Sequence, residues 1–261
     1  MLSAKARTAI KRLVPRKYLP PVKEIYGLYA PRQVFCPCCG QLFSKFEPFG
    51  VRPRPNALCP GCGALERHRL LWLYLQRKTD FFRAPYRVLH IAPEEIYQRI
   101  FRRLPNLKYV SADLMSRNAM VRTDITELGF AEHSFDVVLC IHVLEHVVDE
   151  KRALAEIRRV LKPRGWAILL SPIDTNREVT FEDPSVTTPE DRLRIFGQSD
   201  HVRIYGRDYK ERLERAGFTV LADPFAEHLG SRRLLRFGLV KSEVIYLCIK
   251  THTPMTDPGL K

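Results

Sequence analysis

Residues 135–147 read FDVVLCIHVLEHV, and this stretch decides the fold. Its first seven residues are apolar apart from Asp136, and such a run is typical of a central parallel strand that is buried on both faces. Residues 151–161 then form an amphipathic helix that Pro163 and Gly165 end, and residues 166–170 are apolar again. A strand, a helix and a strand in this order predict one unit of a parallel α/β sheet.

The same alternation continues on both sides of this stretch. We expect further strands at 86–91, 108–112, 121–123, 218–221 and 244–250, and helices at 94–103 and 208–216. Residues 86–250 are therefore predicted to form an α/β domain with a doubly wound, seven-stranded, Rossmann-like sheet. A connecting helix is expected at 67–85 and a flexible tail at 251–261.

The chain is strongly basic, with 43 lysines and arginines against 29 acidic residues and a net charge of +14. This charge favours anionic partners such as nucleic acid, phosphorylated metabolites or acidic lipids. Residues 1–33 predict a basic amphipathic segment and linker. A helix at 1–14 either contacts an anionic membrane surface or packs on its own domain. Because neither an export signal nor a spanning segment is recognisable, we expect a cytoplasmic protein, with peripheral contact to the inner membrane face through residues 1–14.

Five of the seven cysteines lie in two short motifs, CPCCG at 36–40 and CPGCG at 59–63, and each motif contains one C-x-x-C pair. Two thiolates at C-x-x-C spacing bind one ion, and the following glycine accepts the backbone angle that the tight turn requires. Residues 34–66 therefore predict a zinc-ribbon module with one structural Zn²⁺, or alternatively iron, held by Cys36, Cys39, Cys59 and Cys62. A closed four-sulfur site has no open position for a substrate, so the ion is expected to stabilise the module. Cys140 and Cys248 lie in apolar runs and are expected in the core.

The stretch at 135–147, together with LKPRGWAIL at 161–169, resembles the class I methyltransferases that use S-adenosylmethionine. In that family a strand of this kind leads to a loop at the cofactor, and an LKPGG turn precedes the next strand. Arg164 here replaces one glycine. The resemblance covers residues 86–172 and implies methyl transfer as the activity and S-adenosyl-L-methionine as the cofactor. The chain is also similar to a bacterial group of zinc-knuckle methyltransferases, through CPGCGALERHRLLW at 59–72, LHIAPE at 89–94 and FGQSDHVRIYG at 196–206.

The resemblance also implies which residues contact the cofactor. Asp113 lies 22 residues after Ile91 and matches the acidic residue that accepts the ribose hydroxyls. Asp124 and Ile125 match the loop beside the adenine, and the remaining contacts are expected at the end of the fourth strand, from Cys140 and His142.

The first motif departs from the family. The glycine-rich turn D/E-x-G-x-G is replaced by VLHIAPE at 88–94. Glycine in this turn lets the backbone approach a ligand closely, and Ala92 is the smallest residue that can replace it. Glu94 is expected to receive the ammonium group of the cofactor, and His90 is expected to contact the cofactor as well.

Transfer of a methyl group from a sulfonium depends more on the alignment of the reacting atoms than on acid–base catalysis. An oxygen nucleophile nevertheless reacts faster when a histidine base removes its proton. The candidate bases are His142, His146 and His201. Arg203 and Tyr205 are the candidate contacts to the acceptor, on the 174–206 insertion that we expect on the acceptor side of the cleft. Residues 142–146 also fit the H-x-x-E-H pattern of inverted zinc peptidases. That site needs both histidines on one helix, whereas His142 directly follows a strand and is expected in a loop.

The methyl acceptor is not identified by the sequence. A glycan, lipid-linked or other small acceptor is favoured. Arg67, His68 and Arg69 suggest a positive patch beside the zinc ribbon, which would suit an RNA methyltransferase. Against RNA, the ribbon aromatics are expected to form its small core rather than a stacking platform: Phe35, Phe43, Phe46 and Phe49. The remaining alternative is a non-catalytic binding module with a cofactor-type fold.

Overall fold

The computed structural model describes residues 33–50 and 53–251. The chain divides into two compact units. The cysteine unit contains the described residues up to Tyr74 together with Ala226–Glu243, and the sheet unit contains Leu75–Phe225 and the residues from Val244 onward. The predicted helix at 1–14 and nearly all of the predicted tail lie outside the described residues. Within 33–50 and 53–251, no helix has the length and apolar character needed to cross a bilayer.

The sheet unit is built on a seven-stranded sheet with the order β12-β13-β9-β8-β5-β6-β7. Strands β5 to β9 are parallel to one another. Strand β13 is antiparallel to both of its neighbours, β9 and β12. The predicted Rossmann-like fold class is therefore confirmed. The strands are β5 (Tyr86–Ile91), β6 (Leu107–Asp113), β7 (Val121–Arg122), β8 (Phe135–Ile141), β9 (Leu161–Leu170), β12 (Phe218–Asp223) and β13 (Ile245–Lys250).

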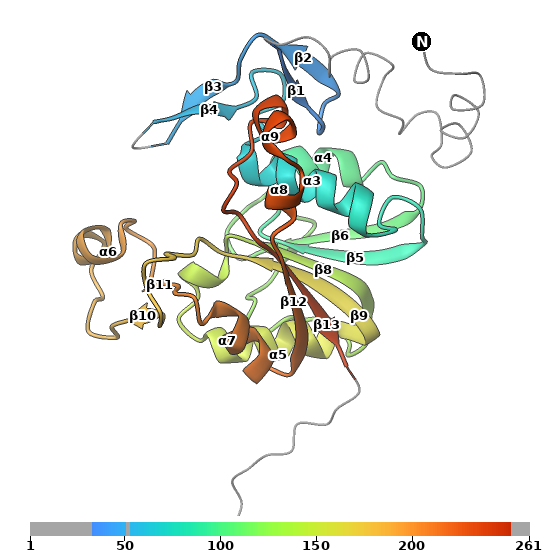
Figure 1. The fold of residues 1–261 in the computed structure, drawn as a ribbon. Helices are drawn as coiled ribbons and strands as arrows, with labels where there is room; N and C mark the ends of the chain where they lie inside the picture. The colour runs from blue at the N-terminus through green and yellow to red at the C-terminus, as the bar shows by residue number, and fades with distance from the viewer. Residues whose placement is uncertain (1–32, 51–52, 252–261) are drawn as a thin grey trace, which may run out of the picture. The chain divides into compact units, whose positions relative to one another are not determined.

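Helices cover both faces of this sheet, with α4 (Glu95–Phe101) on one face and α5 (Glu150–Val160) and α7 (Tyr209–Arg215) on the other (Figure 1). The α5 helix begins where the Asp149 carboxylate accepts the amide of Arg152. Its apolar stripe, which includes Leu154 and Ile157, is buried. In β8 six of the seven side chains are buried, and each large apolar one contributes about 1.5–3 kcal/mol.

The LKPRG turn is a bulge inside β9 rather than a loop before it. Phe135 pairs with Leu161, but Val137 pairs with Trp166, so the intervening residues are extruded. A Cβ on Gly165 would lie 2.9 Å from the Lys162 carbonyl oxygen, and therefore no larger residue fits there. Strand β9 begins at Leu161, five residues earlier than the predicted start, because residues on both sides of the bulge pair with β8.

The insertion at 174–206 forms a small substructure in the sheet unit. It contains β10 (Phe181–Glu182), α6 (Pro189–Phe196) and β11 (Arg203–Ile204). The two strands pair antiparallel, and Gly197, with φ of +85°, ends the helix. Contacts between β11 and the short 3₁₀ helix η1 (Leu144–His146) bring this insertion to the residues that follow β8.

The cysteine unit consists of two hairpins and parts of three helices. The hairpins pair β1 (Val34–Cys36) with β2 (Gln41–Phe43) and β3 (Glu47–Phe49) with β4 (Arg54–Leu58). The helices are α3 (Glu66–Lys78), α8 (Phe225–His228) and α9 (Ser231–Phe237).

Residues 226–243 join the cysteine unit, although the sequence pattern placed them in the 86–250 domain. The Phe237 ring packs edge-on against Phe35, with 6.2 Å between centroids. The buried Arg69 guanidinium also donates hydrogen bonds to the carbonyls of Phe237 and Gly238. These contacts join chain segments more than 160 residues apart, so no local pattern predicts them.

Candidate cofactor site and cysteine cluster

The order of strands reverses between β5 and β8, and in sheets of this kind ligands bind at the carboxyl ends of the strands at such a point. Ala92 follows β5 with φ of +45°, and His142 follows β8 with φ of +54°. The Ala92 amide donates to the Ala112 carbonyl and the His142 amide to the Leu170 carbonyl, each at 2.8 Å. The backbone thus turns sharply after both β5 and β8, which are neighbouring strands. Backbone strain of this kind in non-glycine residues concentrates at ligand sites.

Asp113 ends β6, next to this turn. One oxygen of its carboxylate accepts the amides of Met115 and Ser116, each at 2.7 Å. Among the described residues, the other oxygen accepts no hydrogen bond. The carboxylate is therefore held rigidly with one oxygen available, an arrangement that suits the hydroxyls of a ribose.

His90 and Glu94 form a pair on the other side of the turn. His90 is fully buried, and its ring nitrogens lie 3.0 Å from the Glu94 carboxylate and 3.0 Å from the Tyr109 hydroxyl. Both nitrogens are thus occupied within the protein, so the predicted direct contact from His90 to the cofactor has no free polar atom in this structure. His90 instead fixes the position of Glu94, whose side chain is 16% exposed.

The remaining predicted cofactor residues lie on two other segments. The Asp124 carboxylate accepts the amide and the hydroxyl of Thr126, both at 2.8 Å, which shapes the loop after β7. Ile125 in this loop is buried. Cys140 is also fully buried, and burial raises its pKa well above the usual value, so its thiol belongs to the core. Any contact at Cys140 would have to come from its backbone.

The three predicted histidines gather around Glu145, and we call these four residues the histidine cluster. The rings of His146 and His201 are perpendicular, with 4.7 Å between their centroids. His142 Nδ1 lies 3.3 Å from one Glu145 oxygen, and the Ser171 hydroxyl donates to the other at 2.9 Å. His142 precedes η1 rather than lying within it, which confirms its predicted position in a loop and disfavours the peptidase motif.

The charges in the histidine cluster follow from its burial. Burial opposes ionisation of Glu145, but the His142 ring and the hydrogen bond from Ser171 hold its pKa below the usual value. Burial, together with the neighbouring His146, lowers the pKa of His201. A neutral imidazole therefore faces an ionised carboxylate. The sequence analysis missed Glu145 as a site residue, although the H-x-x-E-H pattern contained it.

Arg203 and Tyr205 were predicted to contact the acceptor, and in the structure both side chains are buried and form hydrogen bonds within the protein. The Arg203 side chain is 2% exposed, and its guanidinium donates to the carbonyls of Leu144, Val147 and Val148. The Tyr205 hydroxyl donates to Glu150 at 2.6 Å, and the residue is fully buried. Both side chains are bonded inside the protein and hold the segment that contains η1.

The four predicted zinc ligands converge in the cysteine unit. All four sulfurs lie within 4.8 Å of one another, with Cys36 and Cys62 at 3.6 Å and Cys39 and Cys59 at 3.8 Å. Sulfurs bound tetrahedrally to zinc at about 2.3 Å lie about 3.8 Å apart. The residues present thus fit a four-sulfur ion site, and Gly40 and Gly63 adopt the positive φ expected of them, +71° and +75°.

The other sulfurs and aromatics of the cysteine unit have structural roles. The Cys38 thiol lies 3.7 Å from the His68 carbonyl and outside the four-sulfur group. Phe35 and Phe46 lie in the core as predicted, whereas Phe49 is 44% exposed.

Two of the three residues of the predicted positive patch at 67–69 are buried, and only Arg67 keeps some exposure. Arg69 is fully buried, and its guanidinium donates to the carbonyls of Ala57 and Ala64 at 2.8 and 2.6 Å, besides those of Phe237 and Gly238. His68 is 5% exposed, and its Nδ1 accepts the amide of Leu65. These two side chains hold the cysteine unit together rather than face a solvent-borne ligand.

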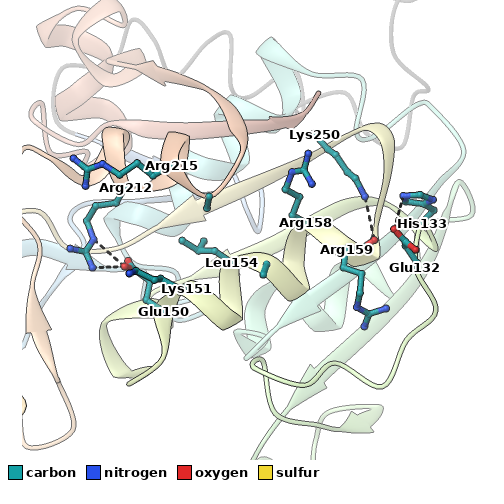
Figure 2. Close-up of a pocket in the computed structure, with 12 residues that line it drawn as sticks. Glu132, His133, Glu150, Lys151, Leu154, Arg158, Arg159, Arg212, Arg215 and Lys250 are labelled. Atoms are coloured by element: carbon teal, nitrogen blue, oxygen red, sulfur yellow. Dashed lines mark hydrogen bonds and ion pairs between the residues drawn. The ribbon is translucent and has the colours of Figure 1, made fainter. Parts of the chain in front are cut away.

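A cavity of about 480 Å³ lies elsewhere in the sheet unit, between α5 and α7 (Figure 2). None of the predicted site residues lines it. Two of its lining cations are bonded locally: Arg212 pairs with Glu150, and Lys250 donates to the Arg159 carbonyl (Figure 2). Lys250 also donates to the Leu161 carbonyl. We regard the carboxyl edge of the sheet as the functional site, because the strained turns and the rigid Asp113 carboxylate lie there.

Comparison with known proteins indicates the class of protein. Residues 102–169 match a family described as a methyltransferase domain. Together with the sheet order, the match supports an S-adenosylmethionine-dependent methyltransferase.

Individual relatives are more distant. A sterol 4-C-methyltransferase of Caenorhabditis elegans is 31% identical over 33% of this chain and 24% of its own length. An ajmaline N-methyltransferase of Rauvolfia serpentina is 25% identical over 60% of this chain and 49% of its own length. The chain therefore spans less than half of these two curated relatives. A solved 1,6-didemethyltoxoflavin-N1-methyltransferase of Burkholderia thailandensis, with S-adenosylhomocysteine bound, is 16% identical with a TM-score of 0.44, and the match covers 70% of this chain and 76% of that one.

Proposed function

We propose that this protein transfers a methyl group from S-adenosylmethionine to an oxygen or nitrogen of a glycan, a lipid-linked molecule or another small acceptor. The observation that supports this most is the rigid Asp113 carboxylate beside the paired turns at Ala92 and His142. A ribose-binding carboxylate at a reversal of strand order is the arrangement that nucleoside ligands use in folds of this type.

Each residue has a role in this proposal. Asp113 accepts the ribose hydroxyls, and the loop at Asp124 and Ile125 lies beside the adenine. Glu94, held by His90, receives the ammonium group of the methionine moiety. The cofactor, when bound, supplies a methyl group activated by its positive sulfur. The protein then aligns the acceptor atom with this methyl group and removes a proton from it, for which the histidine cluster is the nearest set of bases.

A small or glycan acceptor is favoured over RNA. Two of the three basic residues that suggested an RNA surface, His68 and Arg69, are buried and bonded to the backbone. Phe35 and Phe46 are likewise buried, so they offer no stacking platform for bases. In the cysteine unit we propose a Zn²⁺ ion that stabilises the fold, with iron as the alternative.

The proposal is tested by two measurements on the purified chain. Calorimetric titration with S-adenosylmethionine is expected to show one binding event per chain, and absence of binding would leave only a non-catalytic module. Tritiated-methyl transfer to fractionated cell extract is expected to label polysaccharide, lipid or small molecules. Label in the RNA fraction alone would overturn the preferred acceptor class. Metal analysis of the same preparation distinguishes zinc from iron.

A further inference from the structure

Three metal-ligating side chains of the sheet unit lie close together beside the proposed methyl-transfer site. Glu145 and His146 belong to η1, and His201 precedes β11 on the insertion. Their ligand atoms lie within 4.8 Å of one another. Around an ion with ligands at about 2.0–2.2 Å, neighbouring ligand atoms lie about 3–3.5 Å apart. Small side-chain rotations therefore bring the three ligand atoms within coordination distance of one ion.

Glu145 provides a second and independent observation. Its side chain is 2% exposed, and one oxygen accepts the Ser171 hydroxyl. The other oxygen is buried without a hydrogen bond, although the His142 ring lies 3.3 Å away. A buried carboxylate oxygen without a hydrogen-bond donor is costly unless a positive charge compensates it. A cation between Glu145 and the two imidazoles would provide that charge.

The segments that contain these side chains are fixed to each other. The Val202 amide donates to the Glu145 carbonyl at 2.9 Å, which joins the insertion to η1. The buried Arg203 guanidinium donates to the carbonyls of Leu144, the first residue of η1, and Val147, the residue after it. Asp200 lies 3.2 Å from His146 Nδ1 and orients that ring. Such a preset arrangement lowers the cost of ordering the ligands when an ion binds.

We propose that Glu145, His146 and His201 bind one divalent transition-metal ion, and that its open positions chelate two neighbouring oxygens of the methyl acceptor. Two imidazoles and one carboxylate suit zinc, iron, cobalt or manganese and leave coordination positions free. The set follows the carboxyl end of β8, where the acceptor must meet the methyl group. This inference rests on the proposed function and deepens it, because it selects acceptors with adjacent oxygens, such as a vicinal diol.

The chemistry of the transfer agrees with such a site. The acceptor hydroxyl loses its proton to solvent or to His142, its oxygen forms a bond to the methyl carbon, and the carbon–sulfur bond breaks with its electron pair on sulfur. The positive charge of the sulfonium disappears as the proton is released. A cation near the hydroxyl lowers the pKa of that group and therefore eases the loss of the proton.

Metal binding is tested by calorimetric titration of Co²⁺ into the purified protein, with the four-cysteine site already filled with zinc. We expect one Co²⁺ per chain, with an absorption spectrum typical of nitrogen and oxygen ligands rather than thiolates. His201→Gln and His146→Gln are each expected to weaken binding about tenfold or more. The exposed His228→Gln serves as the matched control and is expected to bind Co²⁺ as the parent does.

Two outcomes would overturn the inference. One is no Co²⁺ binding beyond the cysteine site, and the other is equal binding by the parent, His146→Gln and His201→Gln. Circular dichroism checks folding, and the half-exposed His146 provides a variant that is tolerated if His201→Gln unfolds. Titration with S-adenosylmethionine in the same samples separates the two claims. Loss of cofactor binding in the parent defeats the proposed function, whereas cofactor binding without Co²⁺ binding defeats only the metal site.

Discussion

Ala92 and His142 share a left-handed backbone conformation, with φ of +45° and +54°, at the ends of two neighbouring parallel strands. Ile91 pairs with Cys140, so the two turns lie almost level across the sheet. Each turn is locked by an amide hydrogen bond to the next strand outward. The strand ends therefore part at the point where the strand order reverses, and a ligand can approach the backbone there without glycine in either turn.

Enlarging Ala92 is expected to weaken cofactor binding. Ala92→Val places a β-branched residue at positive φ, which is strained, and adds two methyl groups at the turn. We expect the dissociation constant for S-adenosylmethionine to rise about tenfold or more, whereas Ala92→Gly should bind at least as well as the parent. Calorimetry measures both, and Ala155→Val, exposed on α5, controls for the added volume. Undiminished affinity in Ala92→Val would mean that the cofactor does not approach this turn.

Asp113 is expected to contribute directly to cofactor affinity. Asp113→Asn keeps a side-chain oxygen for the amides of Met115 and Ser116 but removes the charge. A hydrogen bond to a charged group contributes about 1.5–3 kcal/mol, so affinity should fall about tenfold to a hundredfold. The measurement is calorimetric titration with S-adenosylhomocysteine, and Glu214→Gln on α7 is the control. If Asp113→Asn bound the nucleoside normally, the ribose position would be wrong.

The sequence predicts the sheet well because each parallel strand is an almost continuous apolar run, and β8 shows this most clearly. It predicts that Cys36, Cys39, Cys59 and Cys62 come together, because the spacing within each C-x-x-C pair is local. It fails where a residue's role depends on distant partners. Arg203 and Arg69 look like solvent-facing cations in the sequence, yet backbone carbonyls from distant segments surround both. Glu145 lies in a recognised pattern, but only the fold brings His201 to it.

The two adjacent cysteines of the first knuckle allow a direct test of the metal site. Cys39→Ser is expected to lose bound zinc and to destabilise the cysteine unit, because metal binding and folding are coupled in such modules. Cys38→Ser, whose sulfur lies outside the four-sulfur group, should retain one zinc per chain. Metal analysis and thermal melting provide the measurements. Cofactor affinity of Cys39→Ser should persist, because the proposed cofactor residues all belong to the sheet unit. Retained zinc in Cys39→Ser would exclude the assigned ligand set.

Arg69 is expected to be among the most important residues for the stability of the cysteine unit. Its guanidinium satisfies carbonyls on three segments and lies over the Phe46 ring, 3.9 Å from the centroid. Arg69→Gln leaves several of these buried oxygens unpaired and should cost about 3–5 kcal/mol. Urea denaturation measures this loss, and the exposed Arg233→Gln should change stability by less than about 0.5 kcal/mol. Similar losses in both variants would contradict the structural role of Arg69.

Glu243 should make the stability of the cysteine unit depend on pH. Burial, and then the nearby Glu66, raise the pKa of Glu243 to about 7. Between the ordinary glutamate pKa and this value the folded chain keeps a proton that the unfolded chain has lost. The contribution of Glu243 to the free energy of unfolding is therefore fully present below about pH 4.5 and is lost as pH rises to about 7.

Because the Glu243 side chain keeps some exposure to solvent, we expect a loss of about 1–2 kcal/mol over this range rather than the full linkage value. Glu243→Gln removes the titration, so this variant should exceed the parent in stability at pH 8 and match it more closely at pH 5. Urea denaturation of both chains across this range provides the comparison. Taking the difference between them cancels the release of zinc from protonated thiols, which affects both equally. Glu227→Gln, at an exposed position of the same unit, should show no such difference, and a pH-independent gap between Glu243→Gln and the parent would refute the raised pKa.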